Sequence, residues 1–165
     1  MSAVLAPLRG VNVWLLSPEQ LARVINSVTT SMLNLSFTLV DQTPRKPVPD
    51  ARVAVVLVSG RRPLIVTVGA RPESAGLMAG AMFGCEPSTL DEMMIDDALC
   101  EVANVTAGQI KRSLAVDQTL GLPVVVSGRL LVERVPDVCD GVLLRSGPIE
   151  LSISLHESDT KVEVP

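Results

Sequence analysis

The chain has 165 residues, of which 47% are hydrophobic and 19% are charged. This composition excludes a disordered chain and predicts a single domain, residues 1–165, with a substantial core. A formal net charge of −4 and an aromatic content of only 2% argue against nucleic acid as a partner, because nucleic-acid binders rely on basic and stacking side chains.

The chain lacks the patterns of membrane and metal proteins. Pro7, Arg9 and Gly10 interrupt the first apolar segment, and no apolar run is long enough to span a bilayer, so we expect neither a signal peptide nor membrane insertion. Three cysteines without CxxC spacing are typical of buried thiols in a reducing compartment. These features predict a cytoplasmic protein that binds no metal and no cofactor of its own.

The first helix has a clear start signal. Ser17 is a good N-cap, Pro18 suits the first helical position, and Gln20 completes a capping box. Apolar residues then recur at helical spacing, which predicts a helix to about Asn34. A strand is expected over 36–40.

A β-hairpin and a glycine-rich helix follow. Residues 53–58 and 63–68 are β-branched and apolar, with a turn at 59–62, and predict two paired strands. After Pro72 a short helix ends at Gly84, with glycines at every fourth position. No Gly-Lys-Ser/Thr sequence closes this run, so the spacing favours close backbone packing over a phosphate-binding loop.

The rest of the chain predicts a long helix over 91–114 and then four strands. The expected strands are 122–127, 129–135, 141–145 and 148–156. The fold class is therefore α+β, an antiparallel sheet packed against helices, with an ordered core of about 17–156 and flexible ends at 1–10 and 157–165. A helix followed by strands occurs at about 18–68 and again at 93–155, which leaves open two related α/β halves.

The long helix carries a polar line. At 100° per residue, Asp97, Glu101, Asn104, Gly108 and Lys111 fall within roughly 80° of one another. The opposite side is mainly apolar, with the residues Leu99, Val102, Ala103, Thr106, Ile110 and Leu114. An ordinary solvated face explains such a line, but asparagine and glycine are poor helix formers that no core packing demands there.

The order Asp97, Glu101, Asn104 resembles the signature helix of the CheC/CheX family of chemotaxis phosphatases. In that family an Asp or Ser precedes a Glu by four positions, an Asn follows three positions later, and a proline opens a strand downstream, as Pro123 does here. The preceding hairpin, the glycine-rich helix ending in Gly84 and the acidic linker are also similar. The resemblance covers about 18–155.

The resemblance implies a CheX-like domain that hydrolyses the aspartyl phosphate of a CheY-like response regulator. Glu101 and Asn104 are then the catalytic residues: Glu101 docks against a lysine of the receiver domain, and Asn104 positions the attacking water. Asp97, Gly108 and Lys111 are expected to bind the partner, with Asp97 docking or capping the helix entrance. Mg²⁺ is expected in the receiver domain and not in this chain.

CheC-type members carry the signature twice. In the first helix here Glu19 and Asn26 are seven positions apart, so one site per chain, as in CheX, is expected, and with it a homodimer that pairs through the sheets. Two alternatives remain open. One is a receiver-binding adaptor or flagellar-switch-like component without catalysis, and the other is a purely structural dimerisation domain.

Overall fold

A computed structural model describes residues 15–41, 48–60, 63–115, 118–134 and 141–157. The helices are α1 (Pro18–Leu33), α2 (Pro72–Phe83), a short 3-10 helix η1 (Pro87–Thr89), α3 (Glu92–Ser113) and α4 (Gly128–Arg134). The strands are β1 (Thr38–Asp41), β2 (Arg52–Ser59), β3 (Leu64–Ala70), β4 (Thr119–Leu120), β5 (Val124–Ser127), β6 (Gly141–Ser146) and β7 (Ile149–Glu157). The expected flexible ends at 1–10 and beyond Glu157 lie outside the described residues.

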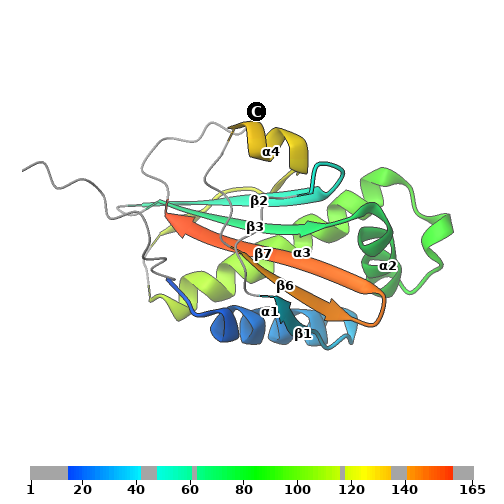
Figure 1. Cartoon of the computed structure of the whole chain (residues 1–165), viewed down its shortest axis with the longest axis horizontal. Helices are drawn as coiled ribbons and strands as arrows, with labels where there is room; N and C mark the ends of the chain where they lie inside the picture. The colour runs from blue at the N-terminus through cyan, green and yellow to red at the C-terminus, as the bar shows by residue number, and fades with distance from the viewer. Residues whose placement is uncertain (1–14, 42–47, 61–62, 116–117, 135–140, 158–165) are drawn as a thin grey trace, which may run out of the picture.

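The strands form one antiparallel sheet, in which β1, β6, β7, β3 and β2 lie side by side in this order (Figure 1). The short strands β4 and β5 both pair with the free side of β2. The predicted hairpin is present, with Val58 opposite Leu64 and Arg52 opposite Ala70. The predicted antiparallel α+β fold is therefore confirmed. Whether its two halves are related stays a prediction.

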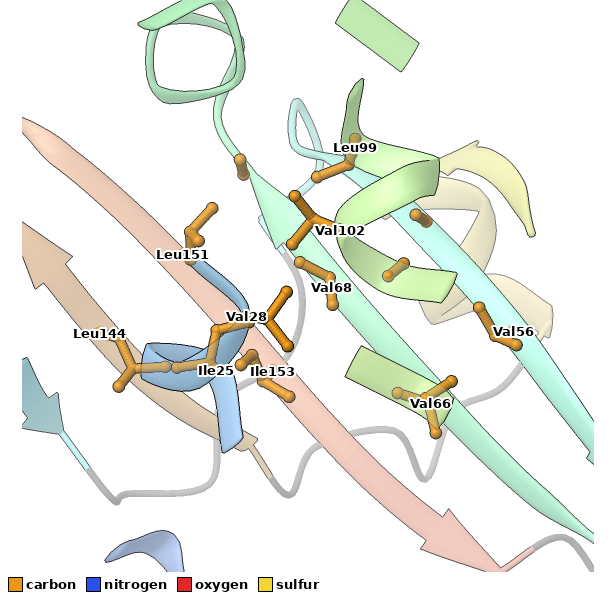
Figure 2. Close-up of a cluster of buried hydrophobic side chains, with 14 of the residues drawn as sticks. Ile25, Val28, Val56, Val66, Val68, Leu99, Val102, Leu144, Leu151 and Ile153 are labelled. Atoms are coloured by element: carbon orange, nitrogen blue, oxygen red, sulfur yellow. The ribbon is translucent and has the colours of Figure 1, made fainter. Parts of the chain in front are cut away.

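The main core lies between one face of the sheet and helices α1, α2 and α3. Because side chains alternate along a strand, Ala54, Val56 and Val58 of β2 face these helices, and Figure 2 shows Leu99 and Val102 of α3 directed toward the same cluster. The other face has a smaller cluster, in which Leu131 of α4 packs on β2 and β3. Helix α3 thus packs on β2 and β3 and reaches the edge strand β5.

The ends of α1 and α2 follow the sequence signals. The Ser17 side chain accepts a hydrogen bond from the Gln20 backbone N–H at 3.1 Å, and the Gln20 side chain accepts one from the Ser17 N–H at 2.8 Å. In α2 the expected close packing occurs at Gly80, where a Cβ would lie 2.8 Å from the Cys85 carbonyl oxygen. Gly84 has a φ of 65° and terminates the helix.

Residues 129–135 were predicted to form a strand, and this is wrong, because residues 128–134 form helix α4. The Ser127 hydroxyl accepts a hydrogen bond from the Leu130 N–H at 3.1 Å and starts this helix. The sequence RLLVER is too short to distinguish a strand from a helix by its pattern. The hydrogen bond of Ser127 at its start favours the helix.

Two of the three cysteines differ from expectation as well, and Cys139 lies outside the described residues. Cys85 is exposed and Cys100 is half-buried, so neither is the fully buried thiol that the sequence predicts. Within the described ranges no group of three or more His, Cys, Asp and Glu side chains could hold a metal ion. No helix in the same ranges is both long and apolar enough to cross a membrane.

Candidate functional site

Helix α3 has a buried side and an exposed side, as the sequence predicts. Leu99, Val102 and Ile110 are buried against the sheet, while Asp97 and Glu101 are exposed. The other members of the polar line, which are Asn104, Gly108 and Lys111, are partly exposed. All five residues of the line therefore reach the protein surface.

The two ends of α3 suit its dipole. Asp91 is the N-cap, and its side chain accepts a hydrogen bond from the Met94 N–H at 2.8 Å. The capping role that the sequence left open for Asp97 is therefore wrong. Lys111 and Arg112 lie in the last turn, where cations stabilise the exposed carbonyl groups. A well-capped helix of 22 residues gives the polar line a rigid support.

Glu101 and Asn104 have no competing partner among the residues that the structure describes. Three positions along a helix place their Cβ atoms about 5–6 Å apart on the same surface. Among the described residues neither side chain forms a hydrogen bond or an ion pair. An acid and an amide with free hydrogen-bonding groups are thus presented side by side.

An ion pair missed by the sequence analysis fixes α3 to the sheet. Arg52 of β2 and Asp96 of α3 are joined by a 2.6 Å contact between Nε and Oδ1. This hydrogen bond, above all, raises the pKa of Arg52, against the opposing effect of burial. Asp96 lies beside the predicted line, but its partner is 44 residues away, so no local signal could identify the pair.

The same acidic turn affects Cys100. Burial raises the pKa of this thiol, and the nearby carboxylates of Asp96 and Asp97 raise it further. Such a thiol is protonated near neutral pH and is a poor nucleophile. A cysteine mechanism at this site is therefore disfavoured, although Cys100 lies one residue from Glu101.

Helix α1 provides no second pair. Both ends of the Asn26 amide bind the backbone of Phe37, with its Nδ2 donating to the carbonyl and its Oδ1 accepting from the N–H, each at 2.6 Å. This asparagine connects α1 to the segment entering β1. Its engagement supports the prediction of one site per chain.

The polar line lies on the side of α3 that faces away from its buried side chains. A cavity of about 120 Å³ does occur, but on the sheet face opposite α3, where it is lined by residues such as Thr67, Gly69, Ser152 and Ser154. No residue of α3 lines it. The cavity and the polar line of α3 therefore lie on opposite sides of the sheet.

Comparisons with known proteins agree with this fold. The model of the family described as "Chemotaxis phosphatase CheX" matches residues 52–144, more than half of the chain and the segment that contains all of α3. No curated protein matches the sequence.

Solved structures of chemotaxis proteins, two of them named CheX, are similar at low identity. A protein assigned to chemotaxis from Desulfovibrio vulgaris Hildenborough has a TM-score of 0.66 and 16% identity, with 90% of this chain and 100% of that chain covered. CheX from Vibrio vulnificus gives 0.63 and 19%, covering 87% and 99%. The CheX-CheY-BeF3-Mg complex from Borrelia burgdorferi gives 0.62 and 17%, covering 87% and 100%. At these identities the structures establish a common fold.

Proposed function

The chain belongs to the CheX family of chemotaxis phosphatases, and on this basis we propose that it hydrolyses the aspartyl phosphate of a CheY-like receiver domain through Glu101 and Asn104. The observation that carries the proposal is the pairing of these two side chains on the surface of α3, without hydrogen-bond partners in the described part of their own chain. The solved CheX-CheY complex supports a partner of this kind.

Asn104 positions the attacking water. An aspartyl phosphate is an activated acyl phosphate, so hydrolysis mainly requires a water in line with the phosphorus. A carboxamide can accept a hydrogen bond from that water and donate one at the same time. Attack of the water oxygen breaks the bond between phosphorus and the aspartyl oxygen, and releases inorganic phosphate and the free aspartate.

Glu101 holds the helix in place on the partner. Its exposed carboxylate pairs with a lysine of the receiver domain in a charge-assisted hydrogen bond. Asp97, one turn earlier, adds negative charge to the same contact, and Lys111 provides a cation farther along the line. In this proposal the Mg²⁺ that assists the reaction is held by the receiver domain.

The division of labour can be tested by steady-state kinetics on phosphorylated receiver domains from the same genome, with acetyl phosphate as the phosphate donor. We expect Glu101→Ala to raise KM about tenfold and to change kcat little, since it removes a docking contact. Glu133→Ala is the matched control, because Glu133 is an exposed glutamate on α4, on the opposite face of the sheet.

Two outcomes would count against the proposal. If wild-type protein accelerates phosphate loss from none of these receivers, it is not a phosphatase for them. Tight binding without acceleration would instead support the adaptor or flagellar-switch-like alternative.

A further inference from the structure

The edge of the sheet beside α3 contains a one-residue bulge. β4 pairs with β2 through Leu120 and Val58, and β5 pairs with β2 through Val124 and Val55. Between these pairs two residues of β2 oppose three residues of the edge, 121–123. The extra residue interrupts the ladder and redirects the side chains around it.

The backbone holds this bulge in one conformation. The Gly121 N–H donates a hydrogen bond to the Leu57 carbonyl oxygen at 2.7 Å, and a Cβ on Gly121 would lie 3.0 Å from that oxygen. Pro123 fixes its own φ and needs no ladder donor, as suits an edge position. Leu122 lies between Gly121 and Pro123, so the backbone on both sides of it is restrained.

The bulge lies level with the catalytic pair. A Cβ on Gly108 would lie 3.8 Å from Cδ1 of Leu120, which places these residues beside each other. Arg52 at the start of β2 contacts Asp96 near the start of α3, and Leu120, which lies beside Gly108 farther along α3, pairs with Val58 near the end of β2. Helix α3 and β2 therefore run in the same direction, and the antiparallel edge strand runs opposite to α3. From Leu120 to Leu122 the edge strand advances about 7 Å toward the N-terminal end of α3. From Gly108 back to Asn104 the helix covers about 6 Å in the same direction. Leu122 and Asn104 therefore lie at the same height along α3.

Two apolar side chains at this surface are unusually exposed. Leu122 is 89% exposed and Met93 is 73% exposed, whereas the other exposed large hydrophobic residues in the described ranges reach at most 45%. Met93 lies on α3 four residues before Asp97, so it continues the polar line at its N-terminal end. Neither side chain belongs to a hydrophobic core cluster. Along the axis of α3, Leu122 lies level with Asn104, and Met93 lies about 12 Å before Glu101.

We propose that Leu122 and Met93 are the apolar contacts by which this chain holds the receiver domain. The inference rests on the proposed function, because a partner whose cleft receives Asn104 must lie over the same surface. The occupant is therefore a protein that offers a lysine to the acidic line and apolar side chains at the rim of its cleft. Burial of Leu122 and Met93 supplies affinity, and the polar pair supplies the chemistry.

The test measures binding and turnover separately. The probe is a receiver domain from the same genome, loaded with Mg²⁺ and beryllofluoride for binding and phosphorylated for turnover. Leu122→Ser and Met93→Ser are each expected to raise Kd about tenfold, with kcat at saturation unchanged. Leu122→Met should retain binding, because it keeps an apolar side chain of similar size.

Val40→Ser is the matched control, since Val40 is 45% exposed on β1 at the other end of the sheet order. Circular dichroism and thermal melting establish that each variant is folded. If wild-type protein binds and dephosphorylates the receiver but Leu122→Ser and Met93→Ser bind it equally well, this inference is wrong and the proposed function stands. If wild-type protein neither binds nor dephosphorylates any receiver, the proposed function fails as well.

Discussion

Asn26 and Asn104 lie on two helices that pack against each other, and their amides have different surroundings. The Asn26 amide is consumed by the backbone of Phe37, whereas Asn104 has no hydrogen-bond partner in the described part of the chain. Composition and helix spacing identify Asn104 as unusual but give no sign of the role of Asn26. Its partner is 11 residues away, in a segment that no helical pattern includes.

Replacement of Asn26 should affect stability and not catalysis. Asn26→Ala removes two hydrogen bonds and leaves the partly buried N–H and carbonyl of Phe37 without them, which should lower the free energy of unfolding by about 2 kcal/mol. Urea denaturation measures this change. Asn104→Ala should unfold like wild-type protein, and a comparable loss of stability in that variant would show that Asn104 has a structural role.

Cys100 reports the charge on the acidic turn of α3. The Asp97 carboxylate disfavours the thiolate and contributes to the raised pKa of Cys100. Asp97→Asn removes that charge and should lower the pKa, so the thiolate fraction rises and iodoacetamide should modify Cys100 about two- to threefold faster at about pH 8.

Mass spectrometry of the alkylated peptides measures this rate, and exposed Cys85 serves as the internal control. Burial is the largest cause of the raised pKa and is unchanged by the substitution, so the effect should be modest. A slower reaction at Cys100 in Asp97→Asn would contradict the assigned electrostatics.

Helix α3 and its two faces were predicted from local sequence. Its periodicity is long and its two faces differ in polarity, so its existence, its bounds within one residue at each end, and its buried side all follow from local sequence. Helix α4 was missed because its seven residues lack such a pattern. The bulge at 121–123 was not predicted either, since it depends on pairing with β2, which is distant in sequence.

A substitution at Gly108 tests the stability of α3 and its role as a docking surface independently. An alanine Cβ there would make only an ordinary contact with Leu120, so Gly108→Ala should stabilise the protein by up to about 1 kcal/mol through helix propensity. If the glycine provides room for the partner, the same variant should bind the receiver domain more weakly. Thermal melting and a binding titration together test this, and a variant that melts higher and binds equally well would remove Gly108 from the docking surface.

At the scale of the whole molecule, the sequence predicted the order of the elements better than their spatial arrangement. The antiparallel α+β class follows from hairpins and helix patterns. The strand order places β1 next to β6, and Thr38 pairs with Arg145 across more than half of the chain. Such pairings result from long-range packing, which no local pattern encodes.

The homodimer implied by the family resemblance remains a prediction about the whole molecule. Static light scattering at micromolar concentration should give twice the mass of one chain. A monomeric mass under these conditions would contradict it, and would leave the α3 surface as the only interaction surface proposed.

The most direct test of the account is the single-turnover rate of aspartyl-phosphate loss from a receiver domain saturated with this protein, compared between wild-type protein and Asn104→Ala. Gln109→Ala is the control, because Gln109 is an amide on the same helix outside the polar line. We predict that Asn104→Ala binds the receiver with unchanged Kd and loses about 100-fold in rate, while Gln109→Ala retains the wild-type rate. An Asn104→Ala protein that dephosphorylates its bound receiver as fast as wild-type protein would contradict the proposed mechanism.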